Sequence, residues 1–143
     1  MIKFLDLYKQ DKILHKKILK KISNLFKNGD FILGKEVQIF ENEFSKFCGS
    51  KYAISCANGT DALTLALKSL NLPINSEVLI PAMTYCSTAF SVVEANLKPV
   101  LVDIGYLSST ICTEDLRKKI NKKTKVILPV HLHGSVANLK EIR

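Results

Sequence analysis

The chain has 143 residues, of which 47% are hydrophobic and 24% charged, and its formal net charge is +8. This length and composition are typical of one globular domain or part of a larger one, and they exclude a disordered chain. No apolar stretch approaches the roughly 18 residues that a membrane-spanning helix requires, so we expect no membrane association.

The positive charge is concentrated near the N-terminus. Residues 1–30 carry eight Lys and three Asp, whereas residues 31–143 carry 13 basic and 10 acidic side chains. The N-terminal lysines lack the interleaved Arg and stacking aromatic side chains that nucleic-acid readout uses. We therefore interpret them as a solvated helix face and expect no nucleic-acid binding. The basic balance does favour an anionic small ligand.

The cysteines and the N-terminus indicate the cellular compartment. Four cysteines, at positions 48, 56, 86 and 112, have no Cys-x-x-Cys spacing, so neither a zinc site nor a dithiol site is predicted. The N-terminus lacks the continuous apolar segment and small-residue cleavage site of a secretory signal. We expect a reduced, cytoplasmic protein.

The first 50 residues predict a helical segment. Residues 9–28 place apolar side chains at helical spacing, and the turn at Gly29 predicts where this helix ends. Residues 36–47 predict a second helix with Phe side chains on one face, and Gly49 is expected to terminate it.

From residue 51 onward, short apolar runs alternate with helical patterns. We expect strands over 52–56, 77–80, 99–103 and 125–130, and helices over 60–70, 86–95, 113–120 and from 137 to the end. Near-continuous apolar runs indicate strands that are buried on both faces, as in a mostly parallel sheet. Thr113 is expected to cap its helix. The sequence therefore predicts an α/β fold with a mostly parallel sheet flanked by helices, divided into residues 1–50 and 51–143.

The stretch Asn58-Gly59-Thr60-Asp61 lies between a predicted strand and a predicted helix. A helix N-terminus exposes free N–H groups, Gly allows close approach to the backbone, and Thr adds a hydroxyl donor, which together suit a phosphate. The same residues also arise where Asn58 or Thr60 simply caps a helix. No Walker motif or G-x-G-x-x-G pattern is present, so neither a nucleoside triphosphate nor a Rossmann dinucleotide is indicated.

Two other predicted strands are followed by, or end in, residues that could contact a ligand. Tyr85 follows the strand over 77–80, where it is placed to stack on a flat ring, although an isolated Tyr is more often a core or surface aromatic. Asp103 ends the strand over 99–103 and is equally often a turn or cap residue.

Histidines and cysteines give weaker signals. On a strand, His131 and His133 would point to one face, but a metal ion needs further ligands and none is evident nearby, so we predict polar strand-end residues and no metal site. Cys56 and Cys86 would need an adjacent base to act as nucleophiles, and we interpret them as buried structural thiols.

Six stretches in a fixed order point to one family. They are Phe31–Val37, Phe40-Glu41, Asn58–Leu63, Glu77–Tyr85, Lys98–Asp103 and Thr124–Gly134. Together they resemble the DegT/DnrJ/EryC1/StrS family of pyridoxal-phosphate-dependent sugar aminotransferases, from about residue 2 to the end. The resemblance implies the N-terminal part of the large domain of a type I aminotransferase fold, in a homodimer. It also implies transfer of an amino group from glutamate, through pyridoxal 5'-phosphate (PLP), to a nucleotide-linked keto-sugar destined for a surface polysaccharide or glycoconjugate.

The resemblance assigns roles to four residues. The backbone N–H groups of Gly59, Thr60 and Asp61, with the Thr60 hydroxyl, would hold the PLP phosphate, and Tyr85 would lie against the pyridine ring. The sequence departs from the family at His133, where family members often have Tyr.

The resemblance places the Schiff-base Lys, the acidic partner of the pyridine nitrogen and the small C-terminal domain beyond Arg143. We therefore expect no catalytic residue in this chain and no transamination by it alone, which leaves open whether it acts as an enzyme. The alternative is a non-catalytic protein of the same ancestry that binds a phosphate ligand or acts in regulation. We also expect poor solubility, because sheet edges and a dimer face would be uncovered.

Overall fold

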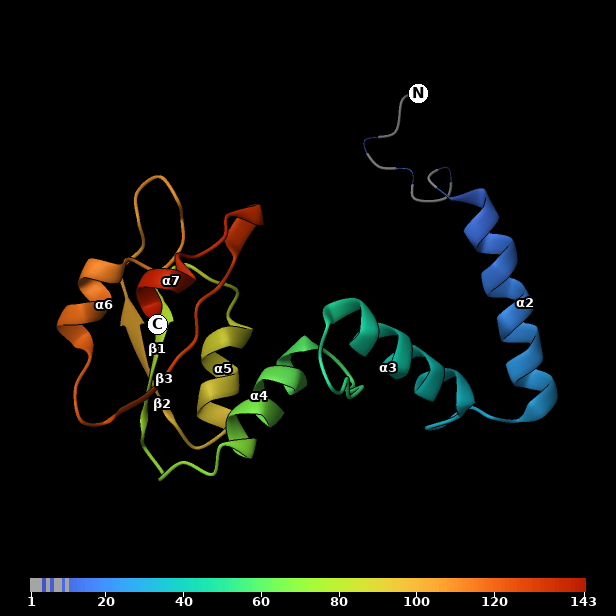
Figure 1. Cartoon of the computed structure of the whole chain (residues 1–143), viewed down its shortest axis with the longest axis horizontal. Coiled ribbons are helices and arrows are strands. Elements are labelled where there is room, and N and C mark those ends of the chain that lie inside the picture. The colour runs from blue at the N-terminus through green and yellow to red at the C-terminus, as the bar shows by residue number, and fades with distance from the viewer. Residues whose placement is uncertain (1–3, 5, 7–8, 10) are drawn as a thin grey trace. The chain divides into compact units, whose positions relative to one another are not determined.

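A computed structural model describes residues 4, 6, 9 and 11–143. The chain divides into two compact units, residues 1–55 and 56–143, and Figure 1 follows them from the N-terminus to the C-terminus. None of the described helices is long and apolar enough to cross a membrane.

The first unit contains two helices, α2 (Lys12–Asn28) and α3 (Lys35–Cys48). The Asp11 side chain caps the start of α2, and Gly29 ends that helix in the left-handed conformation with φ 67°. Gly49 ends α3 in the same way, with φ 64°. Gly adopts this conformation without the penalty of a side chain, so both helices and both terminations are confirmed.

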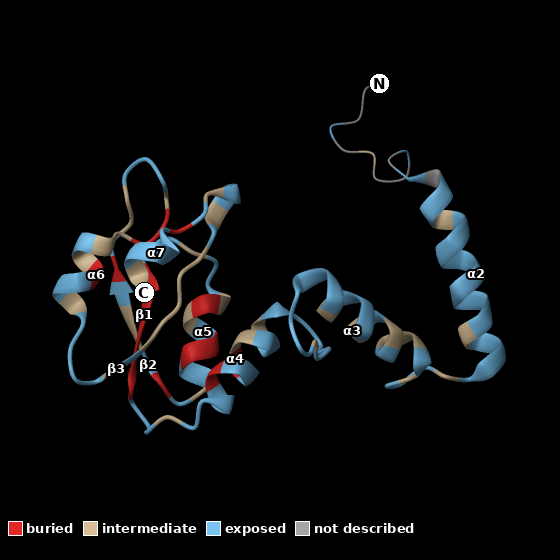
Figure 2. Ribbon diagram, in the orientation of Figure 1, coloured by how far each residue is buried: buried red, intermediate tan, exposed pale blue. Residues whose placement is uncertain are grey.

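No described residue of the first unit is buried, as Figure 2 shows by the absence of red from α2 and α3. The apolar stripes of both helices are exposed: Ile13, Leu14, Ile18, Leu19, Ile22 and Phe26 in α2, and Phe40, Phe44 and Phe47 in α3. Lys21 and Glu36 form an ion pair that links the two helices. The described part of this unit therefore has amphipathic helices without a core of its own.

The second unit is built on a three-stranded parallel sheet. Its strands are β1 (Glu77–Pro81), β2 (Lys98–Val102) and β3 (Thr124–Ile127), in the order β2-β1-β3. Helix α5 (Ser87–Glu94) follows β1, and α6 (Thr113–Lys119) follows β2. Both neighbours pair with β1 in the parallel sense, which confirms the predicted parallel sheet.

Helices cover both faces of this sheet. In Figure 1, α5 and α4 (Gly59–Ser69) lie on one side, and α6 and α7 (Leu139–Ile142) on the other. Two apolar clusters fill the interfaces: Leu67, Val78, Ile80, Val92 and Leu97 on the first side, and Leu79, Val102, Ile111, Leu116 and Ala137 on the second. Successive residues of β1 thus contribute their side chains to opposite clusters, because side chains alternate between the two faces of a strand.

Burial on both faces, expected of every strand, holds fully only for β1. All five β1 residues are buried. In contrast, β2 and β3 contain exposed and half-buried positions. A central strand has neighbours on both edges and helices on both faces, whereas an edge strand keeps one side open.

The strand expected over 52–56 does not form. These residues carry no strand assignment, and the Ser55 N–H donates instead to the Glu41 carboxylate at 2.7 Å. A strand needs a neighbour to supply its ladder hydrogen bonds, and none of the described strands lies beside this segment. The prediction of a strand here was wrong for the chain by itself.

Strand β3 ends earlier than the expected 125–130. The Leu128 N–H still donates to the Leu79 carbonyl at 2.9 Å, but Pro129 has no N–H to continue the ladder. Residues 132–134 form a 3-10 turn in which His133 is left-handed, with φ 52°. His131 and His133 therefore do not share one face of a strand, and that prediction was wrong.

The expected cap of α6 was also wrong by one residue. The N-cap is Cys112, whose carbonyl accepts the first helical bond from the Leu116 N–H at 2.9 Å. Thr113 lies inside the helix, because a residue beyond the first accepting carbonyl already has helical geometry.

Candidate functional site

The start of α4 follows directly from its sequence. Asn58 is extended, with φ −163°, and its Oδ1 accepts the Asp61 N–H at 2.9 Å. Its Nδ2 donates to the Asp61 carboxylate at 3.0 Å. Asn58, and not Thr60, is therefore the helix cap, which is one of the two possibilities that the sequence left open.

Capping by Asn58 leaves two backbone N–H groups at the start of α4 available to bind an anion. Within the described part of the chain, the N–H groups of Gly59 and Thr60 donate to no protein acceptor. A methyl group added at Gly59 would meet no atom within 4 Å, so the backbone there is open. These two N–H groups lie at the positive end of the helix dipole, which favours a phosphate.

The roles predicted for Gly59, Thr60 and Asp61 in phosphate binding remain predictions. The geometry separates Asp61 from the other two, because the Asp61 N–H already donates to Asn58 Oδ1, whereas the N–H groups of Gly59 and Thr60 have no such acceptor in the described chain. The hydrogen-bonding surface at this helix start thus consists of the Gly59 and Thr60 amides and the Thr60 hydroxyl.

Tyr85 lies in the loop that follows β1. Its carbonyl accepts the Thr88 N–H at 3.0 Å, and the hydroxyls of Thr84 and Thr88 lie 2.8 Å apart, which ties this loop to α5. The Tyr85 side chain itself is 74% exposed. The loop is therefore held by its backbone and by Thr84, while the phenol ring is available to contact another group.

The helix start and Tyr85 belong to the same end of the second unit. Helix α4 packs against α5, and Figure 1 shows both helices starting toward the end of the sheet where β1 finishes. Ligands of open α/β sheets commonly bind at this carboxyl end. The stacking role predicted for Tyr85 remains a prediction.

Asp103 acts as a turn residue at the end of β2. Its carboxylate accepts the N–H of Ile104 at 2.8 Å, and its own N–H donates to the Asp115 carboxylate at 2.8 Å. That backbone bond, followed by Lys119 at 2.7 Å, lowers the pKa of Asp115 below its usual value. The hydrogen bond between the Asp103 N–H and the Asp115 carboxylate therefore holds the end of β2 against α6.

His131 has a structural role, and two cysteines that were predicted to be buried lie at the surface. His131 Nδ1 accepts the buried Ala137 N–H at 3.1 Å and so holds the turn at the end of the sheet. Among the described residues, no three His, Cys, Asp or Glu side chains are grouped as metal ligands would be. Cys56 and Cys86 are exposed free thiols, so their expected burial was wrong.

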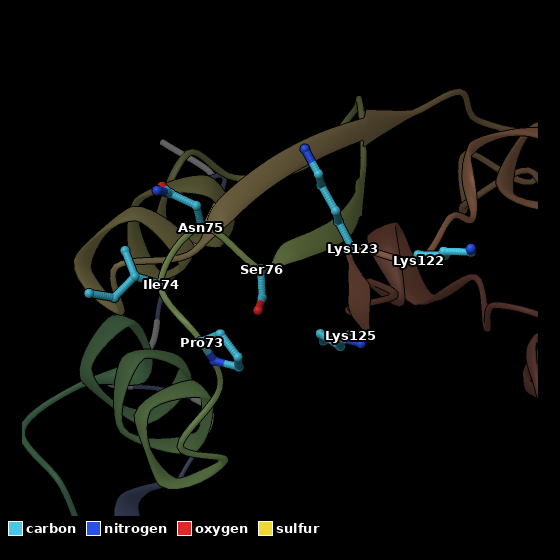
Figure 3. A pocket seen from close by; sticks show the side chains of 7 residues that line it. All are labelled: Pro73, Ile74, Asn75, Ser76, Lys122, Lys123 and Lys125. Carbon is cyan, nitrogen blue, oxygen red and sulfur yellow. The ribbon is translucent and has the colours of Figure 1, made fainter.

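A separate hollow lies at the amino ends of β1 and β3, opposite the carboxyl end. Figure 3 shows the residues that line it: Pro73, Ile74, Asn75, Ser76, Lys122, Lys123 and Lys125. The side chains of Lys122 and Lys123 point in different directions, so they do not converge on one anion. The residues predicted to bind a cofactor, at the start of α4 and in the loop after β1, lie instead at the carboxyl end of the sheet.

Two polar contacts were not predicted because they join residues far apart in sequence. Glu41 accepts the Ser55 N–H across 14 positions. Glu77 accepts a hydrogen bond from Asn121 Nδ2 at 2.7 Å, 44 positions away. No local motif marks such pairs, and only the folded chain brings them together.

Comparison with known proteins identifies the family. The sequence profile of the DegT/DnrJ/EryC1/StrS aminotransferase family matches residues 12–143. The chain belongs to this family. Its resemblance on six ordered motifs is thereby confirmed.

The alignments with two similar proteins cover nearly the whole of this chain. The UDP-2-acetamido-2-deoxy-3-oxo-D-glucuronate aminotransferase of Pseudomonas aeruginosa is 39% identical over 142 residues, which are 99% of this chain and 40% of that one. The pleiotropic regulatory protein of Geobacillus stearothermophilus is 33% identical over 141 residues, or 99% of this chain and 38% of its own.

Solved structures confirm the fold. The structure of S. venezuelae DesV in complex with a ketimine intermediate matches with a TM-score of 0.92 and 32% identity, over 99% of this chain and 38% of that chain. The chain therefore has the α/β fold of this family of aminotransferases, and it spans about 40% of the length of the curated relative from P. aeruginosa.

Proposed function

We propose that this chain is the N-terminal portion of an aminotransferase that moves an amino group from glutamate, by way of PLP, to a nucleotide-linked keto-sugar. The observation that carries the proposal is the start of α4, where two backbone N–H groups beside the Thr60 hydroxyl have no protein acceptor in the described chain. The P. aeruginosa relative supports the substrate class, because its name specifies a UDP-linked 3-oxo sugar acid.

The residues at this helix start fit the phosphate of PLP. The amides of Gly59 and Thr60 would hold the phosphate with the Thr60 hydroxyl, and the open space at Gly59 allows it to approach the backbone. Tyr85, with its ring exposed, would lie against the pyridine ring. When bound, PLP supplies an electron sink for chemistry at the carbon atom that carries the amino group.

The remaining chemical groups are proposed to come from elsewhere. The Schiff-base Lys and the acidic partner of the pyridine nitrogen have no counterpart at matching motifs in residues 1–143, so we infer that this chain alone does not transaminate. We also infer that the complete enzyme is a cytoplasmic homodimer. The exposed apolar stripes of α2 and α3 support an assembly that covers them.

The phosphate site is tested by measuring PLP binding to the chain by calorimetry, with and without inorganic phosphate as a competitor. We expect Thr60→Ala to weaken binding about ten-fold, the loss expected for a hydrogen bond to a charged group. Thr113→Ala is the matched control, because Thr113 is also in the first turn of a helix and is expected to leave binding unchanged. Equal weakening by both changes would contradict the proposal.

Inactivity of the chain by itself has a separate test. We expect borohydride treatment in the presence of PLP to give no adduct at one specific Lys, since the Schiff-base Lys of the family is proposed to lie outside these residues. A single modified Lys near residues 57–61, found by peptide mass spectrometry, would overturn this part of the proposal.

A second candidate function is a non-catalytic protein that binds a phosphate ligand or acts in regulation. The similarity to the pleiotropic regulatory protein of G. stearothermophilus favours it. The coding sequence downstream of codon 143 distinguishes the two functions. A continuing frame with the Schiff-base Lys supports the enzyme, and an unrelated frame or a stop codon supports the alternative.

A further inference from the structure

Strand β2 lies at one edge of the described sheet, so part of its backbone faces away from β1. The Lys98 N–H, at 3.0 Å, and the Val102 carbonyl, at 2.7 Å, form hydrogen bonds with backbone groups that flank β1. The direction of the backbone groups alternates along a strand. Residues 99, 101 and 103 therefore turn their N–H and carbonyl groups outward, where a further strand would pair with them.

Two of these outward groups are already bound to side chains of α6. The Leu101 carbonyl accepts Lys119 Nζ at 2.8 Å, and the Asp103 N–H donates to Asp115 Oδ2 at 2.8 Å. Lys119 Nζ also lies 2.7 Å from the same Asp115 oxygen. Asp115 and Lys119 are one helical turn apart, so their ion pair joins the two outward groups of β2 in one continuous chain of hydrogen bonds.

The other outward groups of this edge are also reduced in number. Pro99 has no N–H to offer, and Pro is confined to such edge positions for this reason. The Asp103 carbonyl accepts the Cys112 N–H at 2.8 Å. Among the described residues, only the Pro99 carbonyl and the Leu101 N–H stay open on this edge. A strand that approaches β2 therefore finds one acceptor and one donor.

The composition of β2 makes a closed edge important. Val100, Leu101 and Val102 favour strand structure, and the Leu101 side chain is 56% exposed. Exposed apolar edge strands pair readily with other chains. Two copies of β2, related by a two-fold axis at Leu101, would pair antiparallel and exchange the N–H and carbonyl groups of this residue. Lys119 blocks that exchange, because it occupies the Leu101 carbonyl.

We propose that the outer edge of β2 is a strand-pairing surface for a second copy of this chain, and that the Asp115–Lys119 pair keeps this surface closed. Hydrogen bonds to charged groups are roughly twice as strong as the neutral amide bonds that an incoming strand would offer. Displacing them would also remove the partners of two partly buried charges, whose side chains are 22% and 38% exposed. The inference is independent of PLP binding and of the proposed activity.

Sedimentation of the whole chain tests the closure. The double change Asp115→Ala and Lys119→Ala should strengthen self-association about ten-fold, since two backbone hydrogen bonds become available at the two-fold axis. The matched control is Glu114→Ala with Lys118→Ala, which removes the same charges at the same spacing from exposed positions of α6. Neither double change alters the net charge. Equal self-association of the two double variants would overturn the proposal.

Amide hydrogen exchange of the 15N-labelled chain identifies the surface through which the copies associate. In the variant without the Asp115–Lys119 pair, the Leu101 amide should exchange about ten-fold more slowly in a concentrated sample than in a dilute one, because it gains an acceptor in the second copy. In the unmodified chain its exchange should not depend on concentration. Stronger association without protection of Leu101 would overturn the proposal, since it would indicate contact through another surface.

A single change keeps the test decisive if α6 does not form without Asp115. Lys119→Met keeps the long side chain and removes only the donor to the Leu101 carbonyl, and Lys118→Met is its control. Far-UV circular dichroism shows whether both variants are folded. We expect concentration-dependent protection of the Leu101 amide in Lys119→Met alone. Its absence in the folded variant would overturn the proposal.

Discussion

The two units of this chain contrast in how far they bury their apolar side chains. The described residues of the first unit include none that is buried, although α2 and α3 have well-formed apolar stripes. The second unit buries every residue of β1 between two apolar clusters. Local signals therefore account for where α2 and α3 begin and end, whereas the core of the second unit forms where helices pack against both faces of its sheet.

The largest expected effect is on the core of the second unit. Leu79→Ala removes a side chain that is 0% exposed, and it should lower the free energy of unfolding by about 3 kcal/mol, a typical cost for such a cavity. Urea unfolding measures this change. Ile22→Ala in α2, where the side chain is 41% exposed, is the matched control. A similar loss from both changes would end the contrast between the units.

The next effect concerns the end of α3. Gly49→Ala puts a side chain on a residue with φ 64° in open space, so its cost of about 1 kcal/mol comes from the backbone alone. Amide exchange within α3 should become about five-fold faster. Gly59→Ala is the control in the second unit, since Gly59 is not left-handed and also has open space around it. An equal loss of stability in Gly59→Ala would contradict the assignment of the cost at Gly49 to its left-handed backbone.

The pH dependence of stability should also differ between the units. Hydrogen bonds from Asn121 and then Lys98 lower the pKa of Glu77 below its usual 4.5. Its contribution to stability is therefore complete above pH 4.5 and is lost as the pH falls through the lower pKa of the folded state.

Thermal unfolding from pH 7 to pH 3 measures this contribution. Glu77→Gln should remove part of the decrease in Tm that the unmodified chain shows at acidic pH. Glu36→Gln is the control, because the Lys21–Glu36 pair of the first unit is exposed on both sides and exposed pairs contribute little. An unchanged acid profile in Glu77→Gln would contradict the role assigned to this carboxylate.

The smallest effect on unfolding is expected at the stripe of α2. Ile18→Gln and Ile22→Gln replace side chains that are 45% and 41% exposed, and each should change the free energy of unfolding by less than about 0.5 kcal/mol. The same changes should reduce self-association, measured by sedimentation, because they remove an exposed apolar patch. Destabilisation of 2 kcal/mol or more would show that α2 is covered within the chain.

Much of this fold was predictable because its signals are local. Glycines at positions 29 and 49 end two helices by the conformation they adopt, and Asn58 caps α4 through a contact only three residues away. The short apolar runs at 77–80 and 99–103 predicted two parallel strands, which the structure contains. The family was also predictable, because its motifs are ordered along the sequence.

The tertiary structure decided the features that depend on distant partners. Residues 52–56 have the composition of a strand, but without a neighbouring strand the Ser55 amide bonds to Glu41 instead. Pro129 ends the ladder of β3 and leads into the turn that separates His131 from His133. Helix caps depend on residues a few positions apart, so the sequence alone predicted the ends of α2 and α3. It left Asn58 and Thr60 as alternatives for α4, and it placed the cap of α6 one residue too late. Strand pairing and burial depend on segments brought together by folding, so only the folded chain determined which strands form and that β1 alone among them is fully buried.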